Sequence, residues 1–153
     1  MMMLLSVFRM MRKLMYLIDT NVISELRKGS KANPGVRTFF EHCIQEQHAL
    51  YLSVITIGEL KRGVELIRHR GDDTQAQHLE TWLNQILVQY KHWILPINQE
   101  IALTWGAFRV PHHQNALDKL IASTAHHHQL TVVTRNQKDF EGMDVEVLNP
   151  FHK

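Results

Sequence analysis

Four carboxylate side chains stand next to apolar segments that a folded chain would bury: Asp19, Glu59, Asp118 and Asp139. Taken singly, each is explained as a helix cap or a solvated residue, because the positive end of a helix dipole favours acids in the first turn. Taken together, they can converge only if a positive charge offsets their repulsion, and hard divalent cations bind oxygen ligands. The set therefore indicates a carboxylate site for a divalent cation.

Histidine and cysteine offer weaker candidates. The chain has eleven histidines, and His126, His127 and His128 are consecutive, so their side chains point around a helix end instead of converging. A transition-metal site remains an alternative, but we favour a solvated helix C-terminus. The single cysteine, Cys43, lies in an apolar helical stripe and is interpreted as a buried packing residue. One cysteine excludes an internal disulfide and a thiolate zinc cluster, which favours a reducing cytoplasm.

Short apolar runs alternate with helical stripes along the chain. Strands are expected at 14–19, 50–53, 94–97, 130–134 and 145–148, and helices at about 34–44, 57–69, 79–90, 99–108 and 115–127. Asn33 is expected to cap the first of these helices, and Thr56 with Glu59 to form a capping box for the second. This alternation predicts an α/β fold with a central, mostly parallel sheet flanked by helices on both faces.

Ligands of such sheets bind outside the carboxyl ends of the strands. Asp19 follows the first expected strand, and the segment from Thr134 to Asp139 follows the fourth. We therefore expect these residues to carry most of the functional information.

Length and composition limit the classes of protein that the chain can belong to. Its 153 residues suit one domain, and 44% hydrophobic with 21% charged residues excludes a disordered or fibrous chain. Seventeen Lys and Arg against fifteen Asp and Glu give a net charge of +2, which permits a nucleic-acid partner without requiring one. The basic residues Lys61, Arg62, Arg68 and Arg70 are either an RNA-steering patch or an ordinary polar helix face.

The first fourteen residues are interpreted as an N-terminal extension, with Met15 as the functional start of a single domain over 15–153. Arg9, Arg12 and Lys13 follow the apolar run, whereas a signal peptide carries its charges before that run. No apolar stretch approaches the ~20 residues that span a bilayer. A membrane-surface anchor is the alternative for this segment.

Four ordered segments carry a resemblance to a known family. They are LIDTNVISEL at 17–26, SVITIGEL at 53–60, DKLIASTA at 118–125 and TVVTRNQKDF at 131–140. In this order and spacing they resemble the successive blocks of a PIN domain. More narrowly, they resemble the VapC-type toxins of bacterial toxin–antitoxin pairs, including the FitB-like branch with its closing segment at 145–151.

The resemblance implies a Mg²⁺- or Mn²⁺-dependent endoribonuclease. Asp19, Glu59 and Asp118 would form its acidic core and hold the metal, and Asp19 and Asp118 are expected to bind it directly. Lys119 replaces a small residue and is expected to face solvent.

The supporting residues also follow from the resemblance. Asn21 would orient Asp19, and Thr134 would support the site by hydrogen bonding. Relatives place a fourth Asp where either Asn136 or Asp139 stands here, so we assign Asp139 to the site and Asn136 as an auxiliary.

The resemblance also implies the partners: an RNA substrate, an antitoxin that inserts a basic side chain into the acidic site, and a second copy of the chain. A metal-assisted attack of water on RNA predicts products with a 5′-phosphate and a 3′-hydroxyl. Two alternatives stay open: an RNA-processing nuclease without an antitoxin, and a noncatalytic binding module of the same fold.

Overall fold

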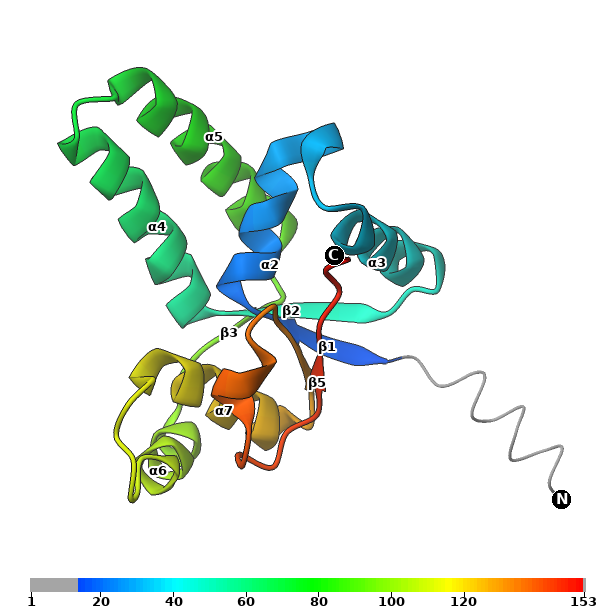
Figure 1. The fold of residues 1–153 in the computed structure, drawn as a ribbon, viewed down its shortest axis with the longest axis vertical. Coiled ribbons are helices and arrows are strands. Elements are labelled where there is room, and N and C mark those ends of the chain that lie inside the picture. The colour runs from blue at the N-terminus through cyan, green and yellow to red at the C-terminus, as the bar shows by residue number, and fades with distance from the viewer. Residues whose placement is uncertain (1–13, 153) are drawn as a thin grey trace, which may run out of the picture.

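The computed structural model describes residues 14–152 and contains a five-stranded sheet (Figure 1). The strands are β1 (Met15–Ile18), β2 (Ala49–Ser53), β3 (Ile94–Leu95), β4 (Thr131–Val133) and β5 (Val147–Leu148). Every pair of neighbouring strands is parallel, in the order β3-β2-β1-β4-β5. The predicted parallel sheet is therefore confirmed, with β3 at an edge, where Pro96 costs no ladder hydrogen bond.

Helices cover both faces of this sheet, as predicted. They are α2 (Thr20–Glu25), α3 (Pro34–Gln45), α4 (Val54–His69), α5 (Asp73–Gln89), α6 (Gln99–Phe108) and α7 (Ala116–His128), with 3₁₀ helices η1 (Leu26–Lys31) and η2 (Gln137–Phe140). In Figure 1, α2 to α5 lie on one side of the strands and α6 and α7 on the other.

The central strands supply both cores because successive side chains of a strand point to opposite faces. Tyr16 and Ile18 of β1 pack into the core under α2 to α5, whereas Leu17 between them packs into the core under α7. Val133 and Val132 of β4 divide in the same way. Burial on both faces explains why these strands are continuous apolar runs instead of alternating ones.

The strand order reverses at β1. The chain proceeds from β1 to β2 and β3 on one side, and then returns to place β4 and β5 on the other side. Connections leave β1 and β4 in opposite directions, which opens a crevice at the carboxyl ends of these two strands. Asp19 and Thr134 are the first residues after β1 and β4, so the topology brings them to this crevice.

Three local predictions are wrong. Helix α4 begins at Val54 because the Ser53 hydroxyl accepts the N–H of Ile55 at 3.1 Å, so Thr56 and Glu59 form no capping box. The short helix α2 was not foreseen, although the Asp19 carboxylate accepts the N–H of Thr20 at 2.8 Å and caps it. Helix α5 begins at Asp73 instead of about residue 79, because the Asp72 carboxylate accepts the N–H of Gln75 at 3.1 Å and caps it.

Other expectations are confirmed. Asn33 caps α3 by accepting the N–H of Gly35 at 2.9 Å, and Cys43 is a buried thiol in the core under α3.

Residues 1–13 of the expected extension lie outside the described residues, so the start at Met15 stays a prediction. None of the helices within residues 14–152 is both long and apolar enough to cross a membrane.

The C-terminal segment closes over the start of α3. Asn33 Nδ2 donates to the carbonyl of His152 at 2.8 Å, and the N–H of His152 donates to Asn33 Oδ1 at 3.0 Å. The close approach requires a glycine at position 35, because a Cβ there would stand 2.2 Å from the carbonyl oxygen of Pro150. Backbone on both sides leaves little room for relaxation.

We expect Gly35→Ala to lower the free energy of unfolding by about 1 to 3 kcal/mol, the usual cost of overpacking. Gly106→Ala is the matched control, because nothing lies within 4 Å of a Cβ at that helical position. It should raise stability by up to about 1 kcal/mol through helix propensity. Urea unfolding of both variants checks this, and equal midpoints would contradict the proposed contact with the C-terminal segment.

Candidate active site

The carboxylate of Asp19 is the most buried acid of the crevice, at 4% exposure. One oxygen, Oδ1, accepts the N–H of Thr20 at 2.8 Å, and the other, Oδ2, accepts the Thr134 hydroxyl at 2.8 Å. Burial raises the pKa of Asp19, and the negative charge of Asp139 adds to this, while the hydrogen bonds from Thr134, Thr20 and Asn21 oppose it. The donors therefore fix the orientation of a carboxylate that burial makes costly to ionise.

A network of polar groups joins the ends of β1 and β4 around Asp19. Asn21 Nδ2 donates to Asp19 Oδ2 at 3.4 Å and to Thr134 Oγ1 at 3.3 Å. In return, Asn21 Oδ1 accepts the backbone N–H of Arg135 at 3.1 Å. Asn21 and Thr134 thus stand where the resemblance placed them, in contact with Asp19.

Glu59 reaches the crevice from the second turn of α4. Helix α4 starts a turn earlier than expected, so Thr56 and Glu59 both lie within it. Because they are three residues apart, they share one face of the helix. The Thr20 hydroxyl lies 3.3 Å from Glu59 Oε1 and 3.2 Å from the Thr56 hydroxyl. Thr20 therefore links Asp19, through its N–H, to Glu59, through its hydroxyl. No role for Thr20 was predicted from the sequence, although its position directly after Asp19 could have indicated that it belongs to the site.

Asp118 comes from the first turn of α7, on the opposite side of the sheet from α4. Burial raises its pKa to about 6, with further contributions from the negative charges of Asp19, Asp139 and Glu59. Burial likewise raises the pKa of Glu59, followed by the charge of Asp19. The carboxylates thus lie close enough to repel one another, and four segments distant in sequence supply them.

The structure distinguishes the two candidates for the fourth acidic position. Asp139 is half-buried in η2, and its charge raises the pKa of both Asp19 and Asp118. Asn136 is exposed, and its backbone N–H donates to the Thr134 hydroxyl at 3.1 Å. Asp139 therefore adds negative charge to the crevice, whereas the contact of Asn136 is made by its backbone.

Lys119 does not face solvent as expected. Its side chain is 8% exposed, and its ammonium donates to the carbonyl of His112 in the connection between α6 and α7. On the neighbouring side of this connection, Trp105 Nε1 donates to the carbonyl of Ala116 at 2.9 Å. The lysine thus ties down the segment that leads into α7 and Asp118, a function that no small residue could perform.

The basic residues after Glu59 separate into paired and unpaired groups. Lys61 and Arg68 form ion pairs with Glu80 at 2.8 and 2.7 Å, which join α4 to α5 and leave little charge for steering RNA. Arg62 instead acts on Glu59, because its positive charge lowers the pKa of that carboxyl against the effect of burial. Arg70 is the C-cap of α4, at the opposite end of that helix from the crevice, so Arg62 is the one member of the predicted steering patch that acts on the acids.

The histidines at the end of α7 contact acids on neighbouring segments. His127 Nδ1 lies 3.4 Å from Glu100 Oε2, and His126 Nδ1 lies 3.9 Å from Asp144 Oδ2. They occupy the last turn of the helix, as expected from the sequence, and no group of metal-ligating side chains forms there among the described residues.

The donor set of the crevice fits a hard divalent cation by type. All of its acids are oxygen ligands, and burial followed by the charge of neighbouring acids raises the pKa of Asp118 and Glu59. Among residues 14–152, no three Asp, Glu, His or Cys side chains stand close enough together to hold one ion in common. Mg²⁺ needs only one or two carboxylates and keeps several waters, so a pair of these acids suffices.

A parallel sheet whose strand order reverses at β1, with an acidic crevice at that point, defines the class of protein. The family model of the PIN domain matches residues 16–146, so the chain belongs to the PIN domain family.

Particular relatives cover most of the chain. It is 37% identical to Toxin FitB of Neisseria gonorrhoeae over 90% of this chain and 99% of the relative. It is 29% identical to the VapC ribonuclease Y4jK of Sinorhizobium fredii over 90% of this chain and 98% of the relative.

Two solved structures share the fold. The crystal structure of FitAcB from Neisseria gonorrhoeae matches with a TM-score of 0.76 and 35% identity, covering 90% of this chain and 99% of that chain. A toxin–antitoxin complex from Klebsiella pneumoniae matches with a TM-score of 0.59 and 26% identity, covering 90% and 99%. The fold seen here is therefore shared over nearly the full length of those chains.

The raised pKa of Asp118 predicts a pH dependence of stability in EDTA. In the unfolded chain the carboxyl titrates near 3.8, and in the folded chain at about 6. An acid whose pKa is raised by folding stabilises the protonated fold, so this contribution is present below about pH 4 and is lost as pH rises through about 6. Asp118→Asn should flatten this decline and raise stability at pH 7 by on the order of 1 kcal/mol after allowing for solvent screening.

Asp144→Asn is the control, because the side chain of Asp144 is 91% exposed. Urea unfolding across pH 4 to 7 checks the prediction. Identical pH profiles for the wild type and Asp118→Asn would show that the crevice does not perturb this carboxyl.

Proposed function

We propose that the chain is a Mg²⁺- or Mn²⁺-dependent endoribonuclease. The observation that carries the proposal is the convergence of Asp19, Glu59, Asp118 and Asp139 from four separate segments, where burial and then the negative charges of the other three acids raise the pKa of Asp118 to about 6. A fold gains no stability from such an arrangement, so a ligand of opposite charge accounts for it. Membership in the PIN family and the name of the VapC ribonuclease Y4jK support RNA as the substrate.

In this proposal two of the acids bind the metal and the others add negative charge. Asp19 and Asp118 are the principal ligands, because Asp19 is oriented by three donors and its charge, after burial, is the largest contribution to the raised pKa of Asp118. Glu59 and Asp139 are not close enough to these two acids to complete a common set of three ligands, and they add negative charge from their own segments. When bound, a divalent ion neutralises phosphodiester charge and lowers the pKa of the attacking water.

The remaining residues of the network keep Asp19 in place. Thr134 and Asn21 donate to the same oxygen of Asp19, which leaves Oδ1 with only the N–H of Thr20 and a free lone pair. Asn136 supports Thr134 through its backbone and is an auxiliary.

We further propose that the chain is the toxin of a toxin–antitoxin pair, acts in the cytoplasm and pairs with a second copy of itself. The names of Toxin FitB and of the Klebsiella toxin–antitoxin complex support this assignment. The acidic crevice suits an antitoxin that inserts a basic side chain, because the unsatisfied negative charge would attract one.

Cleavage of total cellular RNA tests the proposed reaction. We expect discrete fragments with Mg²⁺ or Mn²⁺, none in EDTA, and a loss of at least about a hundredfold in Asp19→Asn and Asp118→Asn, since the metal supplies several kcal/mol of charge stabilisation. Asp144→Asn is the matched control. Growth arrest on expression of the same variants tests the toxin assignment.

The ends of the fragments test the route. Metal-assisted attack of water predicts a 5′-phosphate and a 3′-hydroxyl. Fragments that end in a 2′,3′-cyclic phosphate, or cleavage that persists in both site variants, would contradict the proposal.

A further inference from the structure

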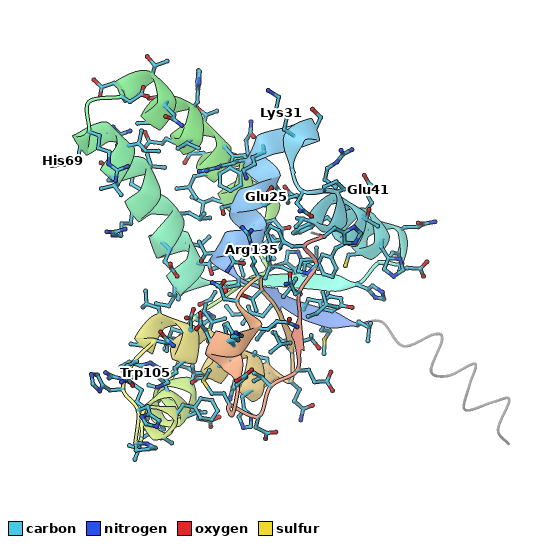
Figure 2. The ribbon with its side chains drawn as sticks, in the orientation of Figure 1. Glu25, Lys31, Glu41, His69, Trp105 and Arg135 are labelled. Carbon is cyan, nitrogen blue, oxygen red and sulfur yellow. The ribbon has the colours of Figure 1, made fainter. Side chains whose placement is uncertain are left out.

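Arg135 is tied to the candidate active site through its backbone. It follows Thr134 at the end of β4, and its N–H donates to Asn21 Oδ1 at 3.1 Å. Asn21 and Thr134 both donate to Asp19, so the position of the Arg135 backbone is fixed relative to the acidic crevice. Figure 2 shows Arg135 at the base of α2, where the upper helical layer meets the sheet.

The side chain of Arg135 rests on an aromatic ring. Its guanidinium carbon lies 4.9 Å from the centroid of Phe151. The ring belongs to the C-terminal segment, which is held at Phe151 by a bond from its N–H to Asn149 Oδ1 and at His152 by the bonds with Asn33. Stacking engages the face of a guanidinium and leaves the N–H donors around its edge available.

Arg135 forms no ion pair with any residue between 14 and 152. Glu25 is the acid that senses this charge, because Arg135 contributes to the lowered pKa of Glu25. The oxygens of Glu25 are taken by other donors, however: Lys28 Nζ at 2.8 Å and the N–H of Asn33 at 2.9 Å. Arg135 is exposed. An oriented, exposed guanidinium with free donors is therefore available to an external anion.

We propose that Arg135 binds a backbone phosphate of RNA adjacent to the one at the acidic site, and that Phe151 is the positioning residue that orients its guanidinium. The inference rests on the proposed function for its ligand class. Arg135 extends from the crevice along α2 towards Glu25 and Phe151, so its guanidinium meets a flanking phosphate instead of the reacting one. Bidentate recognition of phosphate is a property of Arg that Lys lacks.

Binding of a fluorescein-labelled, mixed-sequence single-stranded RNA to the full chain in EDTA tests the proposal without cleavage. One phosphate contact on single-stranded RNA contributes about 0.7 to the slope of log K against log salt, which corresponds to about fivefold in affinity at 0.1 M salt. We expect Arg135→Gln to lose about this much affinity and slope. Arg135→Lys should keep the slope and lose part of the affinity.

Arg70→Gln is the matched control for charge. Arg70 follows His69 at the far tip of the α4–α5 hairpin (Figure 2), and its loss changes net charge equally. It should alter neither affinity nor slope.

A double-mutant cycle tests the role of Phe151. Phe151→Leu keeps an apolar side chain against the core and should weaken RNA binding in the wild type, but not in the Arg135→Gln background. Thermal unfolding of each variant separates this effect from simple loss of the fold.

Unchanged RNA affinity and salt slope in a folded Arg135→Gln protein would overturn the inference and leave Arg135 as a clamp for the C-terminal segment. Metal-dependent cleavage by the wild type would still stand in that case. Conversely, a salt slope that depends on Arg135 in a chain without nuclease activity would support the phosphate site and contradict the proposed reaction.

Discussion

The burial of the Asp19 carboxylate is the constraint on which the site depends. A charge that is only 4% exposed needs either hydrogen-bond donors or a counter-ion. The fold supplies the donors from Thr20, Asn21 and Thr134, and Asn21 and Thr134 also connect the ends of β1 and β4 to each other. Between residues 14 and 152 no cation forms an ion pair with Asp19, and Asp118 and Glu59 add negative charge beside it. Under the proposed function, a bound divalent cation balances this charge.

Topology makes this arrangement available. The reversal of strand order at β1 leaves the carboxyl ends of β1 and β4 uncovered, and α4 and α7 approach this edge from opposite faces of the sheet. Glu59 and Asp118 therefore reach Asp19 from two helices that belong to different cores. Packing elsewhere holds these helices in place: ion pairs from Lys61 and Arg68 to Glu80 join α4 to α5, and buried Lys119 secures the entry to α7.

The architecture and the acids of the site could be predicted from the sequence because they depend on local patterns. Apolar runs ended by polar residues marked β1 and β4, and the ordered motifs placed Asp19, Glu59 and Asp118 in a common frame. Contacts between distant segments could not be predicted in this way. These contacts are the capping of α4 by Ser53 instead of Thr56, the hydrogen bond from Lys119 to the carbonyl of His112, and the stacking of Arg135 on Phe151. Each of these depends on where the chain returns in space, which no short pattern records.

The central claim is that these carboxylates bind a divalent cation, and the stability of the full chain as a function of Mn²⁺ concentration at pH 7 tests it most directly. A ligand that binds only the folded state stabilises it by RT ln(1 + [L]/Kd). The account predicts that Mn²⁺ raises the melting temperature of the wild type progressively, and that Asp118→Asn, although more stable without metal, responds much less. An equal response of both proteins, or none in the wild type, would contradict it.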